Sequence, residues 1–120
     1  MDLNIDAAVT AIDRSTLKAY IVIMIFDWDE AKSLRTLRER GFGFDYAAGI
    51  FSSLTLEKQD DRRDYGESRI QAIGRVNDDV LFVVYTNRNE VRHIISARRA
   101  NRKERKLWQS FVERWSKSAR

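Results

Sequence analysis

The sequence has no cysteine, no proline and only one histidine. Without cysteine there is no disulfide framework and no thiolate zinc site, and a single histidine argues against a histidine-based metal site. A chain without disulfides fits a reducing compartment, so we expect a cytoplasmic protein. Long apolar stretches are also missing. The longest, Tyr20 to Phe26, has seven residues, whereas a membrane-spanning helix needs roughly 20. We therefore expect neither a membrane segment nor a signal peptide.

Acidic residues are scarce near the carboxyl end of the chain. Residues 92–120 hold ten Lys or Arg and two Glu, so the net charge of +4 combines +8 in this segment with −4 in the rest. A positive field this concentrated indicates a polyanionic partner, either a nucleic acid or an acidic protein. The alternative is a helix face that is basic only for solubility.

A length of 120 residues suits one domain. The apolar run Val80–Val84 predicts a central strand that is covered on both faces. Asn87–Glu90 predicts a turn into a second strand over Val91–Ser96, which makes a hairpin.

A helix is predicted after this hairpin. Asn101 and Glu104 have the spacing of a capping box, so the helix should begin near Arg102. Its apolar residues repeat with a helical period and predict a docking face, made of Leu107, Trp108, Phe111, Val112 and Trp115.

Earlier in the chain the pattern predicts a strand over Tyr20–Phe26 and then two helices. The first helix is capped by Asp29, ends at Gly41 and turns Ala31, Leu34 and Leu37 toward the core. The second follows Gly43 and runs to about Phe51, and residues 54–57 and 68–75 read as strands on either side of a polar loop, 59–67. The predicted fold class is therefore α+β, with a mainly antiparallel sheet, two N-terminal helices and a C-terminal basic helix.

Several motifs, in this order and spacing, resemble the BrnT family of bacterial type II toxins. They are Phe26-Asp27-Trp28-Asp29-Glu30-Ala31-Lys32, Gly66-Glu67-Ser68-Arg69, Ile73-Gly74-Arg75, and Ile94 to Ala100 with Glu104-Arg105. The resemblance implies a fold similar to the RelE group of toxins, metal-independent RNA cleavage without a cofactor, and a neutralising BrnA-like antitoxin of the ribbon-helix-helix type. Promoter DNA would be bound only through the antitoxin complex.

The resemblance begins at Met24, so residues 24–120 are expected to form the toxin domain and residues 1–23 a dispensable extension. The chain departs from the family at the end of the first helix, where Arg40 stands in place of the usual histidine. If that histidine transfers a proton, its loss weakens or abolishes activity. If it only bonds backbone or phosphate, Arg40 can replace it.

RNA cleavage without a metal needs a proton acceptor, a proton donor and cations around the phosphate. Glu67 beside Arg69 is the predicted base, with a plain surface ion pair as the alternative. Arg98 and Arg99, at the end of a hairpin strand, are predicted to clamp the phosphate. If the flanking strands are both antiparallel to the central one, these two pairs lie at opposite sheet ends. In that case either Glu67 folds back over the sheet face from the loop after Gln59, or the arginines alone bind phosphate and another group, such as His93 or Lys32, moves the proton.

The remaining candidates are basic residues expected to bind RNA: Lys32, Arg40, Arg92, His93, Arg102, Lys103 and Arg105. Trp28, Trp108 and Trp115 are expected in the core rather than stacked on bases. Three other functions stay open at this point: a nucleic-acid-binding domain without catalysis, a toxin of similar fold that acts on a protein, and a degenerate toxin that binds only its antitoxin.

Overall fold

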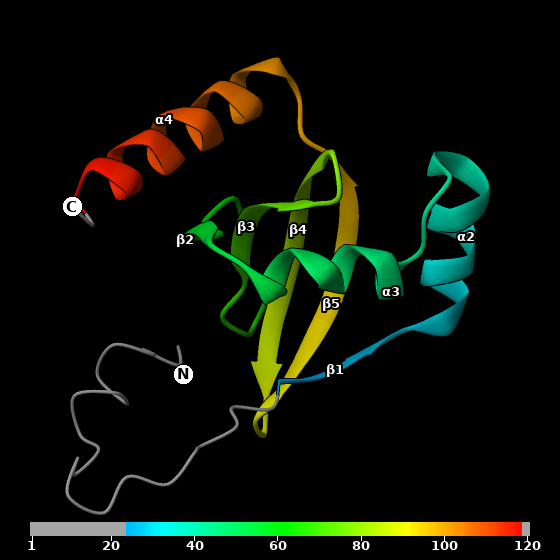
Figure 1. Ribbon diagram of the computed structural model, residues 1–120. Helices are drawn as coiled ribbons and strands as arrows, with labels where there is room; N and C mark the ends of the chain where they lie inside the picture. Colours follow the sequence, from blue (N-terminus) through cyan, green and yellow to red (C-terminus); the bar gives the residue numbers. More distant parts are fainter. Residues whose placement is uncertain (1–23, 119–120) are drawn as a thin grey trace, which may run out of the picture.

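A computed structural model gives the structure of residues 24–118 (Figure 1). The helical pattern predicted within residues 1–19 and the strand start predicted at Tyr20 lie outside this range. The chain forms a five-stranded sheet in the order β1-β5-β4-β3-β2. The strands are β1 (Ile25–Trp28), β2 (Thr55–Gln59), β3 (Ile70–Val76), β4 (Asp79–Arg88) and β5 (Val91–Arg99), and the helices are α2 (Glu30–Arg40), α3 (Phe44–Ala47), the 3-10 helix η2 (Ala48–Ser52) and α4 (Arg102–Ser118).

The sheet is mixed. Strands β2 to β5 pair antiparallel in hairpin fashion, as predicted, but β1 pairs parallel to β5. A parallel neighbour needs a long connection, and here three helices (α2, α3 and η2) and three strands separate β1 from β5 in the chain. The α+β class is therefore confirmed, with a parallel strand at one edge as the correction.

The two faces of the sheet are covered by different helices (Figure 1). On one face, α3 and η2 pack Phe44, Ile50 and Phe51 against the odd-numbered residues of β4. On the other face, Trp108 of α4 packs against Ile73, Phe82 and Val84. Strand β4 is the middle strand, and residues 81–86 are all buried. The prediction of a central strand covered on both faces is confirmed.

The hairpin between β4 and β5 contains one irregularity that matters for the site. The turn uses left-handed backbone angles at Asn89 and Glu90, with φ of 49° and 68°. Farther along, the pairing shifts between Val84 and Tyr85, so that β5 carries one extra residue, as in a β-bulge. Between the turn and this bulge, His93 of β5 pairs with Thr86 of β4.

The buried face of α2 differs from the prediction. Leu34 and Leu37 are 45% and 48% exposed, and Ala31 is exposed as well. Ser33 and Thr36 are buried instead. The Ser33 hydroxyl accepts a hydrogen bond from the Phe44 amide at 2.9 Å. The Ser33 side chain is short and hydrogen-bonded, so the backbone after Gly41 passes close to α2. A leucine side chain at that position would be too large for this close approach.

The ends of the helices are mostly where the sequence places them. Asp29 caps α2, Gly41 ends it with a φ of 85°, and Gly43 precedes α3. The predicted second helix is divided into α3 and η2. Within the described residues, strand β1 ends at Trp28, two residues past the predicted end at Phe26.

Helix α4 also starts where it was predicted to start. The Asn101 side chain accepts from the Glu104 amide, and Glu104 accepts from the Asn101 amide, each at 2.8 Å. Its docking face is only partly used, because Leu107 and Trp115 are 48% and 51% exposed. No helix within residues 24–118 is long and apolar enough to cross a membrane.

Candidate functional site

Polar side chains gather at the sheet end where β4 finishes and β5 begins. Asp27 of β1 pairs in register with His93 of β5, and β4 ends at Arg88. The chain approaching β3 adds Glu67 and Arg69 at the same end. We call Asp27, Glu67, Arg69, Arg88 and His93 the hairpin-end cluster. Asp27 and His93 lie on the sheet face that α4 covers farther along, because their neighbours in sequence, Phe26 and Ile94, point into the opposite core.

Asp27 and His93 form the shortest contact of this cluster. Oδ1 of Asp27 lies 2.7 Å from Nδ1 of His93. A carboxylate only accepts hydrogen bonds, so it favours the tautomer that carries its proton on Nδ1. Nε2 then has a lone pair and, among the described residues, no hydrogen-bond partner. An imidazole oriented in this way is able to take a proton.

Glu67 is held between two arginines. Its oxygens accept from Arg88 at 3.0 and 3.3 Å, and Nη2 of Arg69 lies 3.7 Å away. The hydrogen bond from Arg88 lowers the pKa of Glu67, and the charges of Arg88 and Arg69 lower it further. A carboxylate of lowered pKa stays ionised and is a weaker base. Its contacts suit it to positioning the two guanidinium groups.

Arg69 has unused hydrogen-bonding capacity. Its guanidinium lies 4.0 Å from the centre of the Tyr65 ring, a stacking contact. Its Nε is buried and has no hydrogen-bond partner within residues 24–118. Buried donors are almost always paired, so the unpaired Nε sets Arg69 apart from the other arginines of the described chain.

Arg98 lies away from this cluster. Residues Arg98 and Phe82 are paired across the hairpin, and from Phe82 to Arg88 the strand covers about 20 Å. The Arg98 guanidinium donates to both oxygens of Glu104 at 2.8 and 2.9 Å and lies 4.1 Å from the Phe82 ring centre. The structure therefore separates Arg98 from Glu67 and joins it to the first turn of α4.

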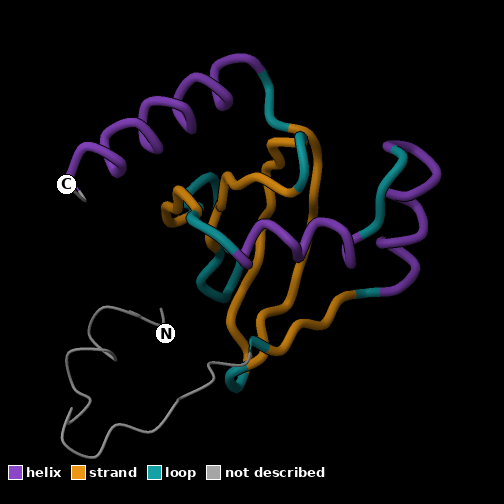
Figure 2. The backbone as a smooth tube through the Cα atoms, in the orientation of Figure 1, coloured by secondary structure: helices purple, strands orange, loops and turns teal. Residues whose placement is uncertain are grey.

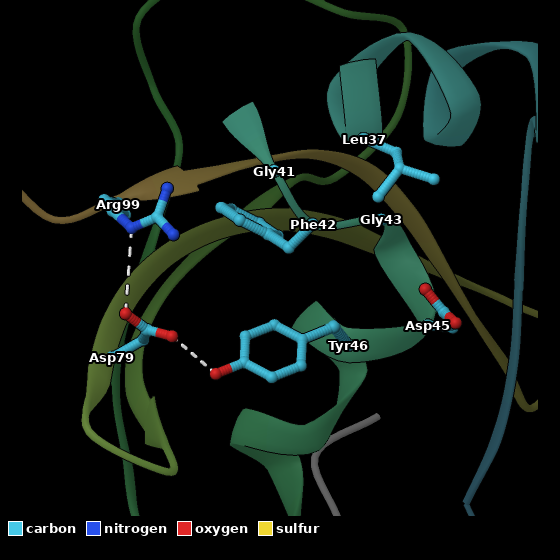
Figure 3. A pocket seen from close by; sticks show the side chains of 8 residues that line it. All are labelled: Leu37, Gly41, Phe42, Gly43, Asp45, Tyr46, Asp79 and Arg99. Atoms are coloured by element: carbon cyan, nitrogen blue, oxygen red, sulfur yellow. Dashed lines mark hydrogen bonds and ion pairs between the residues drawn. The ribbon is translucent and has the colours of Figure 1, made fainter. Parts of the chain in front are cut away.

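Arg99 lines a cavity of about 390 Å³ on the opposite face (Figure 3). Its guanidinium donates to the Arg40 carbonyl at 2.7 Å, lies 3.7 Å from Asp79 and sits over the Phe42 ring. Asp79 also accepts from the Tyr46 hydroxyl at 2.5 Å, and this hydrogen bond raises the pKa of Tyr46. Tyr46 therefore keeps its proton, and Arg99 is occupied by contacts within the fold.

The other basic candidates are scattered. Arg40 donates to the Ala97 carbonyl at 2.9 Å, so it bonds backbone at the position of the family histidine. Arg92 lies between the rings of Phe51 and Tyr85, at 4.7 and 4.3 Å, on the face away from His93. The remaining candidates are exposed on helices, Lys32 on α2 and Arg102, Lys103 and Arg105 on α4.

Two members of the cluster were missed in the sequence. Asp27 belongs to a motif that carries the family resemblance, and Arg88 ends the central strand, but neither position reveals its partner. Only the parallel pairing of β1 with β5 sets Asp27 against His93. Among the described residues, no group of three or more His, Cys, Asp or Glu is placed to hold a metal ion.

Comparison with known proteins agrees with the resemblance seen in the motifs. A family model described as "Ribonuclease toxin, BrnT, of type II toxin-antitoxin system" matches residues 28–104, which is well over half of the 120-residue chain. No curated protein sequence matches the chain. The matched range contains four of the five residues of the hairpin-end cluster and the whole β4–β5 hairpin. The chain belongs to the BrnT family of ribonuclease toxins of type II toxin–antitoxin systems.

Proposed function

We propose that this toxin cleaves RNA at the hairpin-end cluster, without a metal ion, and that His93 is the group that moves the proton. The observation that carries the proposal is an imidazole oriented by Asp27 at the same sheet end as a buried, unpaired donor of Arg69. Together they supply a base and an anion site at one end of the sheet.

In the reaction, Nε2 of His93 takes the proton of a 2′-hydroxyl while that oxygen bonds to the adjacent phosphorus. The bond from phosphorus to the 5′-oxygen breaks, and this oxygen takes a proton from water. The hydroxide left behind takes the proton from the His93 imidazolium, which restores the neutral base. The products are a 2′,3′-cyclic phosphate and a 5′-hydroxyl end. Asp27 stabilises the imidazolium that forms, since the carboxylate accepts its Nδ1 proton in a hydrogen bond.

The negative charge that builds on the phosphate is matched by Arg69 and Arg88. Both guanidinium groups contact Glu67, which fixes their positions before RNA arrives. Donors placed in advance stabilise a transition state more than mobile ones, because they lose no reorganisation energy during the reaction. Glu67, the base predicted from the sequence, thus becomes a positioning residue in this proposal.

The basic surface binds the rest of the RNA. Three exposed cations lie in the first turn of α4, namely Arg102, Lys103 and Arg105, whereas Arg98 and Arg99 at the end of the preceding strand are held by Glu104 and by the Arg40 carbonyl. Contacts of this kind track the phosphate backbone and are weakened by salt. Lys32, Arg40 and Arg92 lie elsewhere, and their predicted RNA contacts would add binding energy without taking part in the chemistry.

The family also implies an antitoxin partner. We infer that this partner is a BrnA-like ribbon-helix-helix protein, that promoter DNA is bound only through the complex, and that the toxin acts in the cytoplasm, where its RNA substrates are.

The proposal is tested with purified toxin and a labelled RNA. His93→Gln should lower the cleavage rate by roughly 10²–10⁴-fold, which is the usual contribution of a general base. Asp27→Asn should also slow the reaction, because the imidazole loses the carboxylate that orients it. EDTA should change nothing.

Arg69→Lys tests the anion site, and Arg75→Lys is the matched control because the exposed Arg75 bonds to Asn77 and Asp78 of its own turn. Lysine keeps the charge but loses the planar fork, so Arg69→Lys should slow cleavage and Arg75→Lys should not. Full activity of a folded His93→Gln protein would refute the proposal. RNA binding by the wild type without any product would instead indicate a degenerate or non-catalytic member of the family.

A further inference from the structure

Helix α4 has an apolar flank that no other described residue covers. Leu107 and Trp115 are 48% and 51% exposed, and both are large side chains. They belong to the same apolar stripe as Trp108, which is buried against the sheet. Figure 2 shows that α4 leaves the end of β5 and extends past the sheet.

Basic residues border this flank. Lys103, Leu107 and Arg114 follow one another at spacings of four and seven residues, so they share one side of the helix. Over its length α4 carries six Lys or Arg and two Glu, Glu104 and Glu113. Glu104 is paired with Arg98. We call Lys103, Leu107, Arg114 and Trp115 the Leu107 flank.

We propose that the Leu107 flank is the docking surface for an acidic, amphipathic segment of the antitoxin. The apolar side chains of such a segment would cover Leu107 and Trp115, and its carboxylates would meet Lys103 and Arg114. A second copy of this chain would bring another strongly basic helix against the first, and like charges repel. RNA matches the charge but leaves Leu107 exposed to water. An acidic protein segment satisfies both features.

The position of the flank gives the antitoxin a way to neutralise the toxin. Helix α4 covers the same face of the sheet that carries His93 at its far end. A segment lying along the flank would occupy the space through which RNA reaches this face. The inference rests on the antitoxin partnership and not on the proposed chemistry at His93.

The experiment measures the affinity of the full-length toxin for its purified cognate antitoxin. Leu107→Glu and Trp115→Glu should each weaken binding about 30-fold, as expected for a central contact of an interface. Arg114→Glu should weaken it and reduce its salt dependence. Gln109→Glu is the matched control, since Gln109 is exposed on the side of α4 that faces the β3–β4 turn, and it should change the affinity by no more than about twofold.

RNA cleavage by each free variant is measured in parallel. Leu107→Glu should retain cleavage and lose inhibition by the antitoxin. Unchanged antitoxin affinity in the Leu107→Glu and Trp115→Glu variants would overturn the inference. Loss of cleavage in both variants, with antitoxin binding intact, would assign the flank to RNA and overturn it as well. A gain in antitoxin affinity after deletion of residues 1–23 would mean that these residues compete with the antitoxin for the Leu107 flank, which also contradicts the inference.

Discussion

Replacing Arg98 with alanine separates two roles that the residue could have. The sequence predicts a phosphate clamp, whose removal typically costs about 2.7–4 kcal/mol in the transition state and slows cleavage at least a hundredfold. The structure instead shows the guanidinium paired with Glu104 through two hydrogen bonds and stacked on Phe82. From these contacts we expect Arg98→Ala to lower the stability of the fold and to leave most of the cleavage rate.

The expected loss can be worked out from the exposure of the pair. The side chains of Arg98 and Glu104 are 38% and 14% exposed. The pair therefore lies between an exposed pair, worth up to about 1 kcal/mol, and a buried one, whose disruption costs about 3–5 kcal/mol. Including the contact with the Phe82 ring, at about 0.5–1 kcal/mol, we expect the free energy of unfolding to fall by about 2 kcal/mol.

The assay is urea unfolding of Arg98→Ala, Glu104→Gln and the double variant, with RNA cleavage measured on the folded proteins. If the two residues act through each other, the double variant should be little worse than either single one. Arg35→Ala, which removes an exposed arginine of α2, is the control and should stay within about 0.5 kcal/mol. A stable Arg98→Ala protein with a hundredfold slower reaction would refute this reasoning and restore the phosphate clamp.

Three further predictions concern the fold. Deleting residues 1–23 should leave thermal unfolding of the remaining domain unchanged, and a loss of several kcal/mol would contradict this. The ion pair with Arg62 holds the pKa of Asp60 at about 2, below its ordinary value, so its stabilisation is present above about pH 4 and is lost as the pH falls toward 2. Asp60→Asn should therefore cost about 1–2 kcal/mol in urea unfolding at pH 7, after allowance for the exposed Arg62, and much less at pH 2, where about half of the native Asp60 is protonated. Trp108→Ala should cost about 3 kcal/mol, because Trp108 fills the core between α4 and the sheet, and unchanged stability would mean that α4 does not dock there.

Much of the local structure can be predicted from short stretches of sequence. Asp29 caps α2 through hydrogen bonds to the amides of Ala31 and Lys32, and Asn101 and Glu104 cap α4 in the same way. These contacts join residues two or three apart, so the sequence specifies them almost alone. The central strand is predicted equally well, because only a strand buried on both faces tolerates an unbroken apolar run.

The face that a helix buries is not specified so locally. The apolar pattern of α2 points to Leu34 and Leu37, yet the fold buries Ser33 and leaves both leucines half exposed. The choice depends on the backbone after Gly41, which approaches α2 closely enough for the Phe44 amide to bond the Ser33 hydroxyl. A periodic pattern shows which side chains of a helix are apolar, but it does not show which part of the fold packs against each face of the helix.

The candidate site was decided by tertiary structure to an even greater degree. The sequence by itself determined the family, the basic carboxyl end and the individual importance of Glu67, Arg69 and His93 as candidates. It did not determine that Asp27 would meet His93, because 66 residues separate them and their contact exists only through the parallel pairing of β1 with β5. It also left open whether Arg98 would join Glu67, since that depends on the directions of strands. Antiparallel pairing on both sides of β4 places the start of β3 and the end of β5 at opposite ends of the sheet.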